Sequence, residues 1–168
     1  MGFQNCTIGF MQGRLTELVD NKIQAFPWKN WEEEFELASI NSLKAMEWTL
    51  DAEDLYRNPL MNSEGRKKIQ LLKRKYRLLI PSLTGDCFMQ KPFWKTEGKI
   101  QSNLENDFIK VCENTSKVDI KFIIVPLVDN GAISNKNEEL KLINFFNKIE
   151  NIIENLNMKI VFETDFSP

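Results

Sequence analysis

Short apolar runs alternate with longer segments of helical periodicity, and this alternation restricts the fold more than any other feature of the sequence. The five runs cover residues 7–11, 45–49, 78–83, 121–127 and 159–163. Short strands separated by helices are typical of parallel βαβ units, because a parallel connection has to cross over the sheet. We therefore predict an α/β protein with a parallel sheet.

Two of the intervening segments carry a signal for the start of a helix. Asn30 is a good N-cap residue, and Glu33 follows it at the spacing of a capping box. Ser102 and Glu105 form the same kind of box farther along the chain. These pairs predict that the first helix begins at Asn30 and the third at Ser102.

The other two helices are predicted from the spacing of their apolar residues. A segment from Ser63 to Tyr76 places Ile69 and Leu72 on one stripe, and its many basic residues are expected to form a solvated outer surface. Apolar residues at three- and four-residue steps between Leu142 and Leu156 predict a helix that packs against the sheet.

The number of units predicts an incomplete barrel. Eight units at this spacing would need roughly 300 residues, near the usual size of a (β/α)₈ barrel, whereas the chain has 168. We predict a partial (β/α)₈ TIM barrel of about five strands and four helices. Residues 1–168 would form a single domain, the N-terminal part of a barrel that lacks strands six to eight.

An open flavodoxin-like sheet is the alternative, since it also uses five βα units in about this length. The sequence has neither a glycine-rich first loop for a phosphate nor a closing fifth helix, which favours the barrel. A partial barrel leaves its first and fifth strands as unpaired edges. Those edges would permit a homo-oligomer or pairing with another chain.

Composition excludes several classes of function. Lys and Arg number 22 against 24 Asp and Glu, so a net charge of −2 gives no general attraction to nucleic acid or to an acidic membrane surface. The sequence has neither an apolar stretch long enough to span a membrane nor a secretory signal at Met1, so we expect a cytoplasmic protein.

Cysteine and histidine usage limits the chemistry further. Cys6, Cys87 and Cys112 lack C-x-x-C spacing, which argues against a disulfide framework or a structural zinc site. The sequence has no histidine, so Ser-His pairs, Cys-His pairs and His-rich metal sites are excluded from these 168 residues. Without a histidine to activate it, Cys87 is interpreted as a small buried residue rather than a nucleophile.

Polar residues follow every predicted strand, where the chemistry of parallel α/β folds gathers. In strand order they are Gln12 and Arg14; Glu47 and Asp51; Asp86; Asp129 and Asn130; and Glu163 and Asp165. Carboxylates at four strand ends indicate a hard cation or a polyhydroxylated ligand. Asp and Asn are also ordinary turn formers, and Asp51, Asp129 and Asn130 are the ones most simply explained that way.

Glu163 is the strongest candidate in this set. Strand alternation places it on the same side as Val161, directly after an apolar run where a charge is costly unless it is paired or binds a metal. A salt bridge to a buried arginine is the other explanation. Arg14 could hold a phosphate or carboxylate, or it could neutralise neighbouring acids.

Aromatic residues gather before the first predicted helix, at Phe26, Trp28 and Trp31. Such a group can form a wall against a sugar ring. Packing in the core or at the helix start explains it more simply.

The sequence resembles a bacterial branch of the sugar phosphate isomerase/epimerase family, within the xylose-isomerase-like barrels. The resemblance extends over essentially the whole chain as a set of short motifs. The segments that carry it are residues 8–15 (IGFMQGRL), 23–28 (IQAFPW), 31–35 (WEEEF), 46–48 (MEW), 58–60 (NPL) and 162–165 (FETD).

The resemblance implies a metal-dependent sugar or sugar-phosphate isomerase or epimerase. Such enzymes hold a divalent metal ion, such as Mn²⁺ or Mg²⁺, with carboxylates and a histidine that follow strands five to eight. Glu163 would be the first of these ligands and also a catalytic base, and Arg14, Glu47 and Asp86 would line the substrate pocket. The other ligands fall outside this chain, which is therefore expected to coordinate the metal incompletely and to be inactive alone.

Two other functions can be set against this one. The chain could be a non-catalytic barrel fragment that acts as a binding or interaction module through its strand edges. A relative of the apurinic-site endonucleases would share the fold, but those enzymes use several histidines and this sequence has none.

Overall fold

The protein is built around one parallel sheet with its strands in chain order. The computed structural model describes residues 7–22 and 25–165, so Cys6 and the motif residues Ile23 and Gln24 lie outside it. The strands follow the order β1-β2-β3-β4-β5. Their bounds are Gly9–Met11 (β1), Ala45–Thr49 (β2), Leu79–Thr84 (β3), Phe122–Pro126 (β4) and Lys159–Glu163 (β5). All five predicted strands are confirmed, each within two residues at either end.

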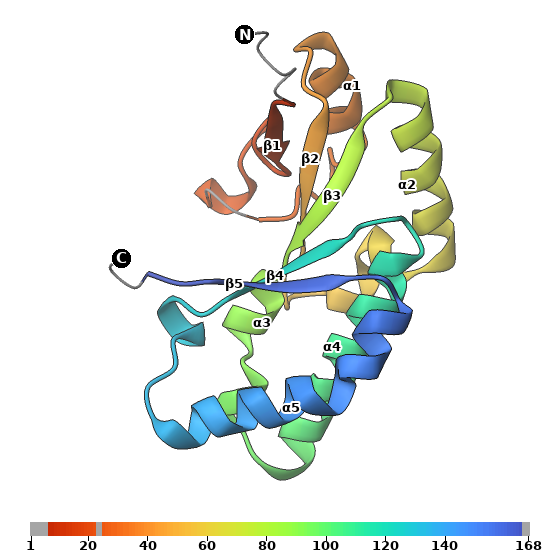
Figure 1. Ribbon diagram of the computed structural model, residues 1–168. Coiled ribbons are helices and arrows are strands. Elements are labelled where there is room, and N and C mark those ends of the chain that lie inside the picture. Colours follow the sequence, from red (N-terminus) through yellow and green to blue (C-terminus); the bar gives the residue numbers. More distant parts are fainter. Residues whose placement is uncertain (1–6, 23–24, 166–168) are drawn as a thin grey trace, which may run out of the picture.

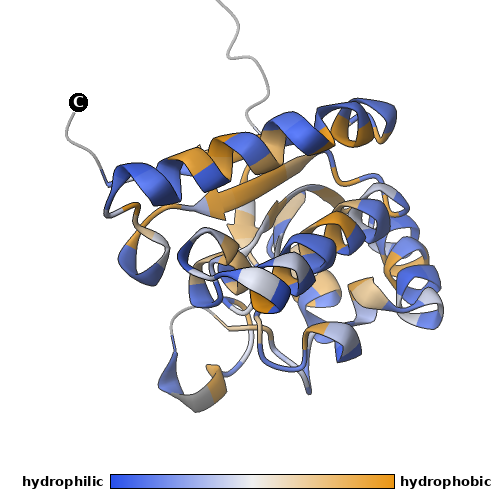
Figure 2. Cartoon of the chain, turned by 90° about the horizontal axis from the view of Figure 1, so that it is seen from below, coloured by the Kyte–Doolittle hydropathy of each residue, from blue (hydrophilic) through white to orange (hydrophobic). Residues whose placement is uncertain are grey.

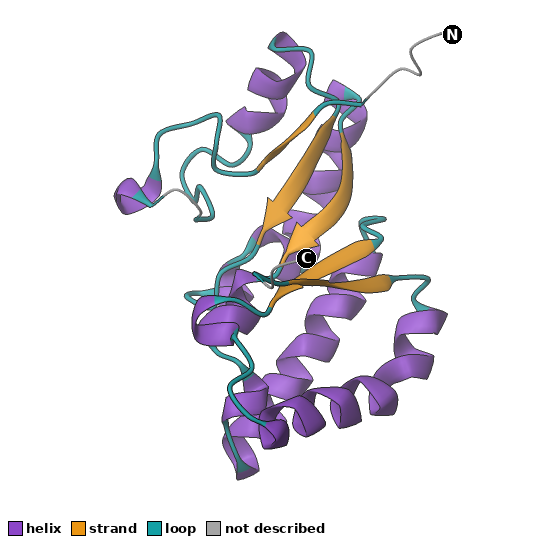
Figure 3. Ribbon diagram, turned by 60° about the vertical axis from the view of Figure 1, so that its left-hand side comes forward, coloured by secondary structure: helices purple, strands orange, loops and turns teal. Residues whose placement is uncertain are grey.

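Helices connect the strands and cover one face of the sheet. The α-helices are α1 (Glu33–Ile40), α2 (Ser63–Tyr76), α3 (Asp86–Gln90), α4 (Gly98–Ser116) and α5 (Lys136–Asn155). Short 3₁₀ helices are η1 (Val19–Asn21), η2 (Leu55–Arg57), η3 (Pro59–Met61), η4 (Phe93–Lys95) and η5 (Asp129–Gly131). Figure 1 shows α2 to the right of the strands and α4 and α5 below them, and Figures 1 and 3 show that the direction of the strands changes from β2 to β5.

Strand order distinguishes the partial barrel from the flavodoxin-like sheet, the two folds that the sequence allows. A flavodoxin-like sheet places β1 between β2 and β3 and has helices on both faces. Here every strand pairs in parallel with the next one along the chain. Crossovers of one hand then carry every helix to the same side, which is the arrangement of a barrel wall.

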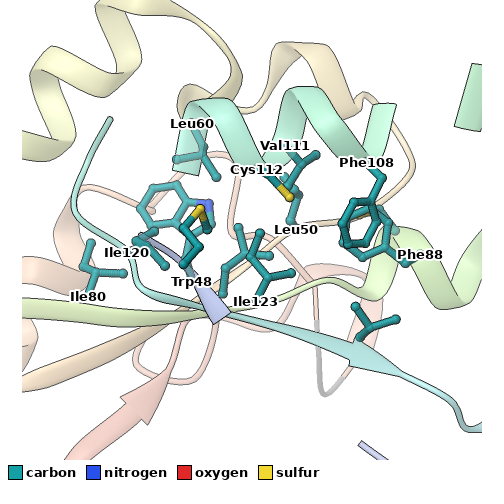
Figure 4. Close-up of a cluster of buried hydrophobic side chains, with 14 of the residues drawn as sticks. Trp48, Leu50, Leu60, Ile80, Phe88, Phe108, Val111, Cys112, Ile120 and Ile123 are labelled. Carbon is teal, nitrogen blue, oxygen red and sulfur yellow. The ribbon is translucent and has the colours of Figure 1, made fainter. Parts of the chain in front are cut away.

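The core lies between the helices and the covered face of the sheet. One row of paired residues on that face is Trp48, Leu83, Ile123 and Ile160, and the first three are fully buried. Figure 4 shows Trp48 and Ile123 facing Val111 and Cys112 of α4. Figure 2 shows the apolar strands beneath helices striped with hydrophilic and hydrophobic residues, as expected for amphipathic helices on a sheet.

The opposite, concave face of the sheet is open over β4 and β5, whereas Thr84 of β3 is only 2% exposed there. The neighbouring row of paired residues on that face includes Thr84, Ile124 and Val161. Val161 is 40% exposed and Phe122, two residues before Ile124, is 39% exposed. This face corresponds to the interior of a closed barrel, which is filled by side chains from all its strands.

Two of the predicted helix starts are wrong. Helix α1 begins at Glu33 with Glu32 at the N-cap and no side-chain cap, while Asn30 lies in a preceding turn. Helix α4 begins at Gly98, so Ser102 lies one turn inside it and donates to the Gly98 carbonyl. The helix from Ser63 to Tyr76 is confirmed, with the side chain of Asn62 as its cap.

Candidate functional site

A depression forms where the carboxyl ends of β3, β4 and β5 meet. We call it the rim depression. Its volume is about 340 Å³, and its lining residues are Asp86, Met89, Gln90, Pro126, Val128, Asp129 and Glu163. Three carboxylates therefore border one concave surface, in the place where parallel α/β proteins bind their ligands.

Glu163 is the last residue of β5 and lies at the edge of this depression. It pairs with Pro126, and its carbonyl accepts a hydrogen bond of 2.8 Å from the Leu127 amide. Its side chain is exposed. Within residues 7–22 and 25–165 its carboxylate has no hydrogen-bond donor or basic partner, so the alternative of a buried arginine partner finds no support there.

Asp86 approaches the same depression from β3. It is the first residue of α3, and it is 3% exposed. Helix α3 is fixed to its surroundings because the Cys87 amide donates to the Leu50 carbonyl at 2.8 Å. The structure thus places Asp86 and Glu163 on the same depression.

Glu47 lies elsewhere on the concave face. Its two carboxylate oxygens accept hydrogen bonds from Ser82 Oγ at 2.6 Å and Thr84 Oγ1 at 2.5 Å. It lines a second depression of about 360 Å³ with residues of β1 and β3. Through successive strand pairs, Glu47 is in register with Lys159 of β5. Glu163 lies four residues after Lys159, which is about 13 Å along the strand.

Arg14 is exposed on the loop that follows β1. The preceding residue, Gly13, has φ +89, and a Cβ there would lie 2.6 Å from the Ala25 carbonyl oxygen. A side chain at position 13 would therefore strain the loop. Arg14 lines neither of the two depressions, so the structure does not bring it to Asp86 and Glu163.

A buried carboxylate that the sequence analysis missed holds this loop. Glu34 of α1 is fully buried and accepts hydrogen bonds from the Gly13 amide at 2.9 Å and the Leu15 amide at 3.0 Å. Burial raises the pKa of Glu34, and the hydrogen bonds from Gly13 and Leu15 oppose that rise. Glu34 lies three residues after Trp31 and four before Ala38. This spacing places it on the inner face of α1 and could have indicated its burial.

We expect the raised pKa of Glu34 to appear in the pH dependence of stability. A carboxyl whose pKa is higher in the folded state contributes stability below its ordinary pKa of 4.5 and loses that contribution as the pH rises through the folded value. The stability of the wild type relative to Glu34→Gln should therefore fall as the pH rises above about 4.5. Urea unfolding of both chains across this range measures the difference, and a constant difference would contradict the prediction.

Two other polar residues near the strand ends, Asp51 and Asn130, hold loops together. Asp51 accepts from the Phe26 amide and from Gln90 Nε2, at 2.9 and 2.8 Å. Asn130 Nδ2 donates to the Met89 carbonyl at 3.0 Å. These bonds give Asp51 and Asn130 structural roles that require no ligand.

The aromatic group before α1 packs on the core. Phe26 is fully buried, with its ring centroid 5.5 Å from that of Trp48, and the Trp31 ring lies 5.8 Å from Trp48. Trp28 is half-buried, with its ring 4.9 Å from Phe26. Core packing therefore accounts for Phe26 and Trp31.

The cysteines that the structure describes are buried thiols. Burial raises the pKa of Cys87 well above its usual value and that of Cys112 to about 12. Thiolates, not thiols, are nucleophiles, so neither side chain is poised for nucleophilic chemistry. This agrees with the interpretation of Cys87 as a small buried residue.

The rim depression offers carboxylates of the kind that bind a divalent metal ion. No group of three or more His, Cys, Asp or Glu side chains close enough to hold a metal ion occurs within the described ranges 7–22 and 25–165. Glu163 would be available as one such ligand, because its carboxylate is unpartnered there and lies on the concave side. Carboxylate oxygen is a suitable donor for Mg²⁺ or Mn²⁺.

Comparison with solved structures identifies the fold. The chain is similar to a D-psicose 3-epimerase crystallised in the presence of D-fructose, with a TM-score of 0.60 and 13% identity over 91% of this chain and 50% of that one. It is also similar to a xylose isomerase domain protein from Planctomyces limnophilus, with a TM-score of 0.58 and 12% identity over 96% of this chain and 55% of that one.

These similarities confirm the predicted fold, a partial (β/α)₈ barrel. The chain spans about half the length of either structure. No family model and no curated protein sequence matches it. In the part of the chain that the structure describes, none of the helices could cross a membrane.

Proposed function

We propose that this chain is the N-terminal part of a metal-dependent sugar or sugar-phosphate isomerase or epimerase. Residues 1–168 would form one domain that supplies five of eight strands, with strands six to eight outside it. The proposal is supported by the likeness to a D-psicose 3-epimerase fold and by the unpartnered Glu163 carboxylate at the concave rim. The reaction would move a proton on the carbon beside a carbonyl, through an enediolate.

Glu163 carries the main role in this proposal. Its side chain follows the apolar run of β5 and opens onto the rim depression, where it would be a metal ligand and a base for the substrate proton. The metal, when bound, would polarise the substrate carbonyl and its neighbouring hydroxyl. One carboxylate is a small share of a complete coordination shell, so the chain alone would be inactive.

Asp86 would bind the substrate beside Glu163, because both line the rim depression. Its carboxylate is suited to accept a hydrogen bond from a sugar hydroxyl. In the proposal Arg14 and Glu47 also line the substrate pocket. Arg14 would have to reach the pocket from an exposed loop. The Glu47 carboxylate accepts hydrogen bonds from Ser82 and Thr84 of the neighbouring strand β3.

The proposed ligand is a small sugar or sugar phosphate, and the proposed location is the cytoplasm. The proposal includes neither a nucleic-acid partner nor a membrane.

We expect Glu163→Gln, made in a chain with the downstream strands present, to lower ketose epimerisation at saturating Mn²⁺ by about 100-fold or more. Mn²⁺ affinity, measured by calorimetry, should fall as well. Glu154→Gln, an exposed residue of α5, is the matched control and should leave both unchanged.

Wild-type turnover by Glu163→Gln would remove this residue from the mechanism. Retained turnover with weakened Mn²⁺ binding would leave it as a ligand and assign the base to another group. Absence of ketose turnover in the wild-type complete chain would reject the proposed reaction itself.

The open concave face favours a second candidate, a non-catalytic interaction module. Leu79, Phe122 and Val161 are 60%, 39% and 40% exposed, and β1 and β5 each pair on one side within the described sheet. Exposed strand edges invite pairing with another chain. Sedimentation of the 168-residue chain distinguishes the two, since a stable monomer contradicts pairing through these edges.

A further inference from the structure

A separate cavity lies between the loop after β2 and the helices after β3. We call it the side cavity. It has a volume of about 380 Å³ and is lined by Ala52, Asp54, Leu55, Tyr56, Arg57, Cys87, Phe88, Lys91, Phe93, Leu104 and Asp107. None of these residues lines the rim depression, so the side cavity is not part of the proposed sugar site.

The interior of the side cavity is apolar and firmly supported. Phe88 and Phe93 border it although they are only 5% and 2% exposed. Their rings pack against Phe108, with centroids 4.4 and 6.4 Å from it. Leu55 and Leu104 form half-buried walls. An apolar, preformed cavity of this size is typical of small-molecule sites.

Most of the charged groups at the entrance are already paired. Arg57 and Asp54 form an ion pair with an N to O distance of 2.7 Å. Asp107 accepts a hydrogen bond from the Tyr56 hydroxyl, which also contacts Lys110 Nζ at 3.2 Å. These groups satisfy one another and leave little net charge for a ligand.

Lys91 is the exception at the entrance. It follows α3, and its amide donates to the Cys87 carbonyl at 3.0 Å, which fixes its backbone beside the cavity. Its ammonium group has no hydrogen-bond acceptor or acidic partner in the described parts of the chain. The side cavity therefore presents an apolar interior with one unpaired cation at its mouth.

We propose that the side cavity binds a small organic monoanion with an aromatic or branched aliphatic body. The body would pack against Phe88, Phe93 and Leu104, and the carboxylate would pair with Lys91. The apolar contacts would supply most of the affinity. The exposed ion pair would add about fivefold, because solvent screens it.

Fluorine NMR with para-trifluoromethylbenzoate tests this proposal on the 168-residue chain. We expect saturable binding that is about fivefold tighter than that of the neutral para-trifluoromethylbenzamide. Lys91→Gln should remove the preference for the acid. Lys95→Gln, a second exposed lysine that does not line the cavity, should keep it.

Methyl NMR of the leucines locates the bound probe in the same titration. Signals of Leu55 and Leu104 should move, while that of Leu142, a buried residue of α5 outside the cavity lining, should not. Lys91 is exposed, so its substitution leaves the folded core intact. Lack of saturation, equal affinity for the amide, an unchanged preference in Lys91→Gln, or shifts at Leu142 alone would each overturn the proposal.

Discussion

Replacing Phe108 by alanine is expected to lower the free energy of unfolding by about 3–5 kcal/mol. Phe108 of α4 is fully buried, and its ring contacts Phe88, Phe93, Phe145 and Phe146 at centroid distances of 4.4, 6.4, 5.4 and 5.4 Å. Removing the ring leaves a cavity that four anchored neighbours cannot fill by small movements. Urea denaturation followed by circular dichroism measures the loss.

Phe122→Ala is the matched control for this substitution. The same atoms are removed, but Phe122 is 39% exposed on the concave face, so the cost should be less than half as large. Equal losses at the two positions would mean that the aromatic cluster around Phe108 is not the centre of the core.

Replacing Glu34 by alanine is expected to destabilise the fold by about 3 kcal/mol. The carboxylate is the hydrogen-bond acceptor for the Gly13 and Leu15 amides. Its removal leaves a buried backbone N–H without a partner, and such a group costs free energy in the folded state alone. Thermal unfolding gives the total change, and hydrogen exchange should show faster opening at residues 13–15.

The neighbouring substitution Glu33→Ala provides the control. Glu33 is exposed in the first turn of the same helix and should change stability by no more than a few tenths of a kcal/mol through the helix dipole. If Glu34→Ala behaved like Glu33→Ala, the loop after β1 would have to be held by its own turns instead.

Strands and the longer helices were predictable because burial repeats regularly along them. Residues 159–163 form β5 with the predicted bounds, and Ser63 and Tyr76 bound α2 as expected. In α2 the apolar residues form a stripe at helical spacing, and in β5 they form a short, partly β-branched run whose length favours a strand. The single-faced arrangement of the helices then followed from strand order.

Helix starts were less predictable because capping motifs are short. Ser102 and Glu105 satisfy the motif, yet α4 begins a turn earlier at Gly98, and Glu105 instead accepts a hydrogen bond from Gln101 at 2.8 Å. The five-residue helix α3 was missed entirely, since a helix of little more than one turn leaves no periodic pattern.

The candidate site was predictable only as a list of strand-end residues. Sequence alone placed Asp86 and Glu163 at strand ends, and the structure unites them in one depression. The distance of Glu47 from that depression depends on ladder register and on a bulge between β2 and β3, which no local pattern encodes. Glu34 was missed because three consecutive glutamates look like a solvated helix start.

The short helix α3 (Asp86–Gln90) lies between the side cavity and the rim depression. Cys87 and Phe88 face the side cavity, while Asp86, Met89 and Gln90 border the rim depression. An occupant that displaced this helix from one side would also move the residues that border the other side. If binding in the side cavity changed the affinity of the rim depression for its ligand, thermodynamic linkage requires that binding in the rim depression change the affinity of the side cavity by the same factor.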